Sequence, residues 1–370
     1  MTHPRAEHSR RLHLQWLAGQ ASLALGAGAW TEPTHALSPR RLDFPRDFGA
    51  HPEVRTEWWY ITGHAQDKAG RQFGFQLTFF RARVDVAQTL QSRFAARQLI
   101  FAHAAVTDLQ GGKLWHDQRI ARQGFGVAQV SEQDTGVQLD RWSLQRQGPV
   151  QESSYLASLA AKDVSLELQC RTTGPVLLQG QQGLSRKGPQ ESQASYYYSQ
   201  PQLVARGQIG LKNQRFEVQG RAWLDHEWSQ ELLHPQAQGW DWIGMNLDDG
   251  SALTAFVLRR ADASALWAGG SFRSAGGASR SFEPHEVGMR ALRHWVSPHS
   301  KARYPVDWQI DTPAGRYTVK ALLDDQELDS RNSTGAIYWE GLSELLDAQG
   351  RRVGRGYLEM TGYWAPLKLS

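Results

Sequence analysis

Three short segments of the sequence place carboxyl, imidazole and aromatic side chains close enough together to form a reactive site. A carboxyl group that is buried beside aromatic faces loses its water, which raises its pKa and suits it to proton transfer near neutral pH. The chemistry expected of such segments is therefore general acid and base catalysis on an apolar substrate. The segments are 51–64, 223–228 and 239–246.

The first segment contains the run Glu57-Trp58-Trp59-Tyr60. Alternation along a strand turns Trp58 and Tyr60 to one face and leaves Trp59 on the other, together with Glu57. We predict that Glu57 is a catalytic acid or base and that the three aromatic residues contact the substrate. The alternative is an ion pair between Glu57 and Arg55 at the edge of a tryptophan-rich core.

The second segment carries Asp225, His226, Glu227 and Trp228 in succession. In a strand, Asp225 and Glu227 share one face, and His226 and Trp228 share the other. We predict catalytic roles for Asp225, His226 and Glu227, and a substrate contact for Trp228. The alternative for His226 is a hydrogen-bonded structural role.

The third segment places Asp241 between Trp240 and Trp242. The carboxylate then faces away from the two indole rings, which both lie on the opposite side of the strand. We predict that Asp241 is catalytic and that Trp240 and Trp242 bind substrate. A structural aspartate bonded to the amides of a turn is the alternative.

Several other chemistries lack their sequence patterns. The chain has no Gly-x-Ser-x-Gly elbow, Walker A motif, Gly-x-Gly-x-x-Gly motif or His-Glu-x-x-His motif, and its histidines are scattered. Cys170 is the single cysteine and is expected to be a buried apolar residue. No metal or cofactor is therefore expected. The 41 basic and 37 acidic residues give a formal charge of +4 without a basic cluster, so no nucleic acid is expected as a partner.

Strands must position these residues, because apolar residues recur with a period of two. Phe73, Phe75, Leu77 and Phe79 alternate with polar residues, and similar alternation begins at Val164 and at Leu253. Turn sequences at 67–70, 248–250 and 347–350 interrupt these runs at the spacing of hairpins. The predicted fold class is all-β. The Gly-, Ser-, Gln- and Tyr-rich stretch 183–200 is interpreted as a long loop.

The chain also repeats two of its patterns in the same order. The run at 58–61 returns as 240–243, and Gly220–Asp225 returns as Gly354–Glu359. Two matched pairs predict two antiparallel barrels in tandem, at 44–230 and 231–370. The segments 223–228 and 357–363 are predicted to close the barrels and remove their sheet edges. The repeat sets Asp241 against Trp59, and His226 against Met360.

Residues 1–36 have the pattern of an export signal. Arg10 and Arg11 precede an apolar stretch at 17–29, and Thr34-His35-Ala36 offers a cleavage site between small residues. The paired arginines are similar to those of twin-arginine signals, which carry folded proteins across a bacterial membrane. We therefore expect a periplasmic or secreted protein.

Four motifs together resemble those of the AttH/CrtC family, which includes carotenoid 1,2-hydratases, hydroxyneurosporene synthase-like proteins and predicted secreted hydrolases. The resemblance covers about residues 44–370. It implies two lipocalin-like barrels and cofactor-free hydration of an isoprenoid double bond, in which His226-x-Trp228 matches a functional element. Asp225, Glu227 or Asp241 is assigned as the proton donor. The motifs are His51-Pro52-Glu53-x-Arg55-Thr56-Glu57-Trp58-Trp59-Tyr60, Trp223-x-Asp225-His226-Glu227-Trp228, Gly239-Trp240-Asp241-Trp242 and Gly354–Tyr363.

The sequence thus predicts an exported enzyme that adds water to a hydrophobic, isoprenoid-like molecule. Two alternatives are a hydrolase and a periplasmic carrier that binds a lipid or isoprenoid without chemistry, which lipocalin folds do often. The expected partners are the hydrophobic small molecule and, transiently, the membrane or an envelope transporter.

Overall fold

The computed structural model describes residues 37–231 and 233–367, and this part of the chain is almost entirely β-structure. Its helical content is four single turns: η1 (Arg46–Phe48), η2 (Asp85–Ala87), η3 (Val150–Glu152) and η4 (Pro284–Glu286). The all-β prediction is confirmed. None of the helices described is long and apolar enough to cross a membrane. The predicted export signal lies outside the described residues.

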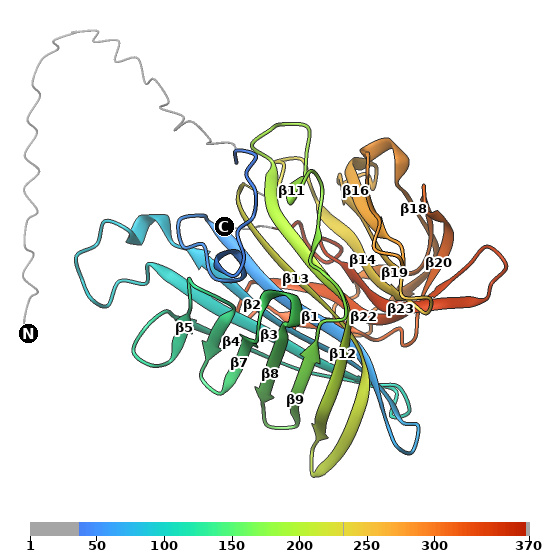
Figure 1. Cartoon of the computed structure of the whole chain (residues 1–370), viewed down its shortest axis with the longest axis horizontal. Helices are drawn as coiled ribbons and strands as arrows, with labels where there is room; N and C mark the ends of the chain where they lie inside the picture. Colours follow the sequence, from blue (N-terminus) through green and yellow to red (C-terminus); the bar gives the residue numbers. More distant parts are fainter. Residues whose placement is uncertain (1–36, 232, 368–370) are drawn as a thin grey trace, which may run out of the picture. The chain divides into compact units, whose positions relative to one another are not determined.

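The first sheet contains all strands from β1 to β13 and is antiparallel throughout (Figure 1, blue to yellow-green). Its order is β4-β3-β2-β1-β13-β12-β9-β8-β7-β6-β5, with β10 and β11 also paired to β12. The strands are β1 (Thr56–Asp67), β2 (Gln72–Arg83), β3 (Gln98–Asp108), β4 (Lys113–Arg122), β5 (Ala128–Val130), β6 (Gly136–Leu139), β7 (Trp142–Gln147), β8 (Ser154–Ala160), β9 (Val164–Arg171), β10 (Leu177–Leu178), β11 (Leu184–Arg186), β12 (Ala194–Leu211) and β13 (Gln214–Glu231).

The second sheet contains the remaining strands, in the order β17-β16-β15-β14-β23-β22-β20-β19-β18, with β21 paired to β22. It is also antiparallel and belongs to the same compact unit as the first sheet. The strands are β14 (Gly239–Leu247), β15 (Ala252–Arg259), β16 (Ala265–Arg273), β17 (Ser279–Phe282), β18 (Gly288–Val296), β19 (Arg303–Thr312), β20 (Gly315–Ala321), β21 (Glu327–Ser330), β22 (Ala336–Leu346) and β23 (Arg352–Met360).

The two sheets share one connection scheme, in which the first strand pairs with the last. β1 pairs with β13 and places Trp59 opposite His226, whereas β14 pairs with β23 and places Asp241 opposite Met360. These are the equivalences that the internal repeat predicts. The two lipocalin-like units are therefore built the same way around a central pair of strands.

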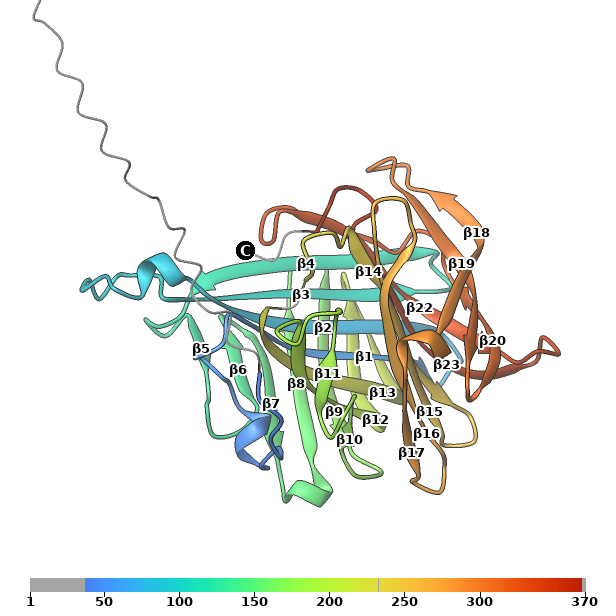
Figure 2. The ribbon, with the colours of Figure 1, turned by 90° about the horizontal axis from the view of Figure 1, so that it is seen from above.

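The predicted role of the last strands in removing the sheet edges is wrong. β13 and β23 do pair with the first strands, but this places them in the middle of their sheets. Within the described residues, the hydrogen-bonded path ends at β4 and β5 in the first sheet and at β17 and β18 in the second. Each unit is therefore a strongly curved sheet with two edges, as the view from above also shows (Figure 2).

The two faces of β2 pack against different apolar layers, because successive side chains alternate between them. Phe73, Phe75, Leu77 and Phe79 are buried in the core of the first sheet, which also contains Cys170. The intervening residues face the second sheet, where a separate apolar layer fills the space between the sheets. That layer is made of Tyr60, Trp223, Trp242, Ala252, Phe256, Leu258, Leu342 and Tyr357.

The interpretation of residues 183–200 as a loop is wrong. β11 lies within this stretch, and the long strand β12 begins at Ala194. The run Tyr196-Tyr197-Tyr198 alternates between the two faces of β12, and tyrosine favours strands. The glycine, serine and glutamine of the stretch concealed this strand, because those residues are more typical of turns and loops.

Candidate active site

A cavity of about 290 Å³ lies between the two sheets and has mostly apolar walls. The first sheet contributes β1, β2, β3, β4, β12 and β13, and the second contributes β14, β15, β22 and β23. Aromatic side chains form much of the wall, and five carboxyl groups line the same space. The aromatic residues include Trp58, Tyr60, Phe80, Phe101, Tyr197, Trp240, Trp242, Phe256 and Tyr338, and the acids are Glu57, Asp225, Glu227, Glu340 and Glu359.

Asp225 is a buried carboxyl group without a cationic partner among the described residues. Trp223 Nε1 donates to its Oδ1 at 2.8 Å, the Ser199 hydroxyl also donates to Oδ1, and the Tyr197 hydroxyl donates to Oδ2 at 3.0 Å. Burial raises its pKa to about 7 even though these donors favour the charged form. Asp225 can therefore take up or release a proton near neutral pH.

Glu340 and Glu359 lie on neighbouring strands of the second sheet, directly opposite each other in the β22–β23 ladder. Burial, followed by the charge of Glu359, raises the pKa of Glu340 well above its ordinary value. Burial raises the pKa of Glu359 to about 7, and the nearby Asp225 adds to this rise. Glu359 lies deep in the layer, but its side chain is partly exposed because it borders the cavity. Burial and the charge of Glu359 thus favour the protonated form of Glu340.

Two polar atoms beside the cavity have no partner of normal hydrogen-bond geometry among the described residues. They are the Tyr60 hydroxyl and Glu340 Oε1, which lie close to each other. The other oxygen of Glu340 accepts a hydrogen bond from Gln76 Nε2 at 2.9 Å. Both residues border the cavity, and a bond between the Tyr60 hydroxyl and Glu340 would hold this carboxyl group at its wall.

Lys187 is the one amino group that borders the cavity among the described residues. Its Nζ lies 3.0 Å from Glu227 Oε1, and both side chains are buried. The same ammonium group lies 4.4 Å from the ring centre of Phe256 and 4.7 Å from that of Tyr197. Glu227 is therefore held as one member of a buried ion pair, which distinguishes it from Asp225.

His103 forms a hydrogen-bonded chain on the wall formed by the first sheet. Its Nε2 lies 2.8 Å from the Ser333 hydroxyl, which donates to Gln118 Oε1, and its Nδ1 lies 2.9 Å from the Tyr338 hydroxyl. Burial lowers the pKa of His103 to about 3, so the ring is neutral. His103 donates from Nε2 and accepts from Tyr338 at Nδ1. This arrangement fixes the Tyr338 hydroxyl near Gln76 and Glu340.

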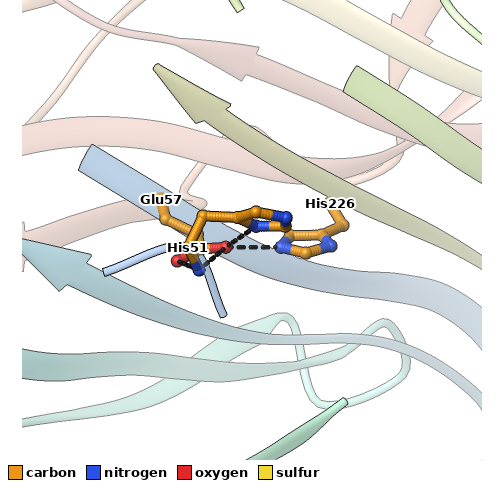
Figure 3. Close-up of side chains that lie close together, drawn as sticks. All are labelled: His51, Glu57 and His226. Atoms are coloured by element: carbon orange, nitrogen blue, oxygen red, sulfur yellow. Dashed lines mark hydrogen bonds and ion pairs between the residues drawn. The ribbon is translucent and has the colours of Figure 1, made fainter. Parts of the chain in front are cut away.

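Glu57 holds two histidines at one carboxylate oxygen, as Figure 3 shows. His51 Nδ1 lies 2.8 Å and His226 Nε2 lies 2.9 Å from Glu57 Oε1. Arg81 Nε donates to Glu57 Oε2 at 2.7 Å, so the buried ion pair of Glu57 is with Arg81. Arg55 instead contacts Asp85. The alternative predicted from the sequence, an ion pair of Glu57 with an arginine, is therefore present, but the arginine is Arg81 and not Arg55.

The two histidines of this network carry different charges. His51 bonds carboxylates through both ring nitrogens, since its Nε2 lies 2.9 Å from Asp47 Oδ1. Burial alone would lower its pKa, but the bonds to Asp47 and Glu57 outweigh burial and raise it. Burial lowers the pKa of His226 to about 4, and its Nδ1 accepts a hydrogen bond from the Tyr198 hydroxyl at 3.1 Å. His51 is an imidazolium ion, and His226 is neutral.

His51, Glu57 and His226 also have the residue types of a metal site. Their atoms are already joined by hydrogen bonds of normal length, and the carboxylate also accepts from Arg81 and from the His51 amide. Those bonds outweigh burial and hold the pKa of Glu57 well below its usual range. A cation bound here would displace these bonds beside an arginine. The donor set fits a structural hydrogen-bond network better than a metal centre.

Asp241 faces the core of the second sheet. Its carboxylate lies 2.6 Å from Arg259 Nε and accepts a hydrogen bond from the Tyr363 hydroxyl at 3.0 Å. Burial raises its pKa to about 6, although the charge of Arg259 opposes this rise. Asp241 is therefore bound by side chains and not by turn amides.

The structure separates the predicted site residues into two groups. Asp225 and Glu227 face the cavity, and Glu57 borders it, as do the aromatic residues Trp58, Tyr60, Trp240 and Trp242. Four others lie outside its lining, because they are on the opposite faces of the same strands. These four are Trp59, His226, Trp228 and Asp241.

Sequence reasoning missed the two glutamates of the second sheet as well as Lys187, His103 and Tyr338. Glu359 had a usable signal, because the internal repeat aligns it with Asp225. Lys187 lies in the stretch that was interpreted as a loop. Glu340 and His103 carry no local pattern that separates them from other strand residues.

The fold and the cavity define a lipocalin-like β-protein with a buried site rich in carboxyl groups. The chain belongs to the AttH-like family, whose profile matches residues 35–363. It is 45% identical to an AttH-type protein of Nitrosomonas europaea, over 89% of this chain and 99% of that one, with a TM-score of 0.82.

Two other solved structures have the same fold at 12% identity. Kievitone hydratase of Nectria haematococca has a TM-score of 0.67, over 88% of this chain and 94% of that chain. CghA with Sch210972 has a TM-score of 0.52, over 84% and 89% of the two chains. No curated protein matches the sequence.

Proposed function

We propose that this protein is a cofactor-independent hydratase that adds water to a double bond of a hydrophobic, isoprenoid-like small molecule. The observation that carries the proposal is a buried carboxyl group, Glu340, at the wall of a cavity lined by aromatic rings, where burial favours its protonated form. Protonation of an alkene requires an acid that keeps its proton at neutral pH and a site that shelters the resulting cation. Structural likeness to kievitone hydratase supports this reaction type.

The first step is proton transfer from Glu340 to the alkene. The π electron pair forms the new C–H bond, Glu340 becomes a carboxylate, and a tertiary carbocation remains. Aromatic faces stabilise cations, and Trp58, Trp240 and Trp242 border the same space. Glu340 Oε1, beside the Tyr60 hydroxyl at the cavity wall, is the atom from which the proton leaves most directly. Glu340 thus takes the donor role that the sequence assigned to Asp225, Glu227 or Asp241.

The second step is addition of water to the cation. The water oxygen supplies the electron pair of the new C–O bond, and its surplus proton passes to Asp225 or Glu359. Both have a pKa of about 7, so a useful fraction of each is ionised at neutral pH. Return of this proton to Glu340 through the carboxyl cluster restores the enzyme. The product is a tertiary alcohol, and no redox partner is needed.

His226 has a positioning role in this proposal. It is stacked on Trp59, with ring centres 4.6 Å apart, and it is hydrogen-bonded to Glu57 on β1. It thereby ties β13 to β1, the two strands that carry Asp225 and Trp58. Its effect on catalysis would come from holding these strands in register.

An exposed apolar patch at the end of the first sheet supports transient contact with a membrane. The β2–β3 connection, residues 84–97, projects beyond the sheet (Figures 1 and 2). Phe94 stacks on Phe125 at 5.5 Å, and Arg122 lies 3.8 Å from the Phe125 ring centre. Ile120 is exposed at 44% and also lines the cavity. The patch comprises Val86, Leu90, Phe94, Ile120, Phe125 and Val127.

We propose that this patch receives the hydrophobic substrate from an anionic membrane surface, since it combines apolar side chains with arginines. Export to the periplasm or beyond is part of the proposal and rests on residues 1–36 of the sequence. Replacing Arg10 and Arg11 by lysine should leave the precursor uncleaved in the cytoplasm, as cell fractionation and N-terminal sequencing would show. Normal cleavage and export of that variant would refute the twin-arginine route.

Incubation with isotopically labelled water tests the hydratase proposal. The purified mature protein is given lycopene or squalene in H₂¹⁸O, and the products are analysed by mass spectrometry. We expect a labelled tertiary alcohol. Glu340→Gln should lower its formation by at least about 100-fold, because loss of general acid catalysis typically costs that much. Glu152→Gln, at an exposed position, is the matched control and should retain activity.

Three results would contradict the proposal. Tight lycopene binding, seen as quenching of tryptophan fluorescence, without any labelled alcohol would identify a carrier instead. Incorporation of label into the acid product of an ester substrate would identify a hydrolase. Full activity of Glu340→Gln would show that the proton comes from another group.

A further inference from the structure

A second hollow of about 380 Å³ lies at the other end of the layer between the sheets. It is bordered by His64 on β1, whereas the aromatic cavity is bordered by Trp58 on the same strand. A strand rises about 3.3 Å per residue, so the two positions are about 20 Å apart along β1. Aromatic residues of the inter-sheet layer that line neither space, Trp223 and Tyr357, separate them. The second hollow is thus a distinct site.

The internal repeat explains why this end is basic. The pattern Gly-Arg-x-aromatic-Leu-acid occurs on β13 and again on β23, and period-two alternation puts its arginine, aromatic and acid on one face. The two acids meet at the aromatic cavity, and the two arginines meet at the second hollow. The triplets are Arg221, Trp223 and Asp225 on β13, and Arg355, Tyr357 and Glu359 on β23.

Four arginines line this hollow, and their charge is only partly balanced. They are Arg206, Arg221, Arg352 and Arg355. Asp248 also lines the hollow, and its contact with Arg352 is long, at 3.4 Å. Glu344 stands opposite Arg355 in the β22–β23 ladder. The hollow is therefore lined by four arginines and one aspartate.

Arg355 has donor capacity that the described residues do not use. Its Nη1 donates to Gln72 Oε1 at 2.9 Å, but its Nε is buried and without a hydrogen-bond partner among them. Arg221 makes only a long contact, 3.5 Å, with the Gln202 carbonyl. Guanidinium groups that are left unpaired beside one another are a typical arrangement for binding an oxyanion through paired N–H groups.

The positive charges of these arginines also affect the pKa of His64. Burial lowers its pKa to about 4, and the charges of Arg355, Arg352 and Arg221 add to this effect. Burial also lowers the pKa of Arg355, and the neighbouring Arg352 contributes. The ring of His64 is therefore neutral and offers one N–H donor. An anion bound in the hollow would relieve the repulsion among the arginines.

We propose that this hollow is a binding site for a phosphate-type oxyanion, held between the two sheets by Arg221 and Arg355. Arg206 and Arg352 complete the site at its rim; Arg221 is exposed as well, and Arg355 is half-buried. Free phosphate and the phosphate of a lipid headgroup share this chemistry. Because one arginine comes from each sheet, the bound anion would link the two sheets at the end opposite the aromatic cavity.

Titration with inorganic phosphate and pyrophosphate, followed by calorimetry, tests the proposal on the mature protein. We expect saturable binding to the native protein and at least tenfold weaker binding to the double variant Arg221→Gln/Arg355→Gln. Arg331→Gln is the matched control, because Arg331 is exposed and bonded to Asp329 on another surface. Arg352→Gln, at the rim, gives an independent reading if the double variant folds poorly, and it should weaken binding less.

Sedimentation with vesicles distinguishes the two sources of phosphate. If the site takes a lipid headgroup, vesicles containing phosphatidylglycerol should bind the native protein, and Arg221→Gln/Arg355→Gln should weaken this binding at least tenfold while Arg331→Gln does not. If it takes free phosphate, the double variant should lose phosphate binding and leave vesicle binding unchanged. Absence of any binding, or equal binding by the native protein and the double variant, would overturn the proposal.

Discussion

Replacement of Asp225 by asparagine should change how the stability of this protein depends on pH. Asp225 is 3% exposed and has no cationic partner among the described residues, and burial raises its pKa from 3.8 to about 7. The asparagine side chain would keep the size of the group and a carbonyl oxygen for Ser199 and Trp223, and its amide N–H could donate to the Tyr197 hydroxyl, but it could not ionise. The substitution therefore isolates the cost of ionising this buried group.

The magnitude follows from the shift in pKa. A rise of roughly three units corresponds to a free energy on the order of 4 kcal/mol, at about 1.36 kcal/mol per unit. The folded-state pKa is raised, so the folded protein binds the proton more tightly than the unfolded chain does. The stabilising contribution of the protonated group is complete below pH 3.8 and is lost as the pH rises through about 7.

Urea unfolding of both proteins at several pH values from 4 to 8 measures this effect. The difference in unfolding free energy, Asp225→Asn minus native, should increase across this range, by an amount on the order of 4 kcal/mol. Other buried acids contribute to the pH dependence of the unfolding free energy in both proteins. Taking the difference between the two proteins removes that common contribution. Asp329→Asn, at a partly exposed position next to Arg331, is the matched control and should show no such increase.

A difference that stays constant from pH 4 to pH 8 would refute the argument for Asp225. It would mean that the group does not change its protonation between the folded and unfolded states in this range. The proposed base would then need to be Glu359, whose pKa is also about 7.

Two further outcomes follow from the buried charges. Lys187→Met should destabilise the protein by about 3 kcal/mol in urea unfolding, because it removes the cationic partner of the buried Glu227. The double variant Lys187→Met/Glu227→Gln should recover most of this loss. An equally unstable double variant would show that packing, not charge, is responsible. Dialysis against a chelator should leave the melting temperature unchanged, since His51 and His226 are each hydrogen-bonded to Glu57. A lower melting temperature that is restored by Zn²⁺ would show that a metal occupies this cluster.

Local pattern was sufficient for the fold class and for much of the strand register. Alternation of Phe73, Phe75, Leu77 and Phe79 predicted β2 and its buried face. The repeat predicted that Trp59 corresponds to Asp241, and the ladders place these two residues equivalently. These results depend on short-range geometry, because the period of a strand is the same wherever it is packed. The same local information misassigned residues 183–200, where composition obscured the period.

The composition of the cavity could not be obtained in this way. Glu340 and Asp225 are far apart in the sequence and belong to different sheets, and both line one cavity because the sheets are stacked. The sequence singled out Glu57 and His226 because they are close to tryptophan, yet tertiary packing joins them to His51 and Arg81.

The amino-acid sequence by itself determined the strands, the repeat and the face of each strand on which a carboxyl or an indole lies. Only the tertiary structure decided which of these faces meet, and hence which acids lose their water. The physical reason is that a pKa shift depends on desolvation and on neighbouring charges. At Asp225 burial is the largest cause of the shift, and the neighbouring charge that adds to it is that of Glu227.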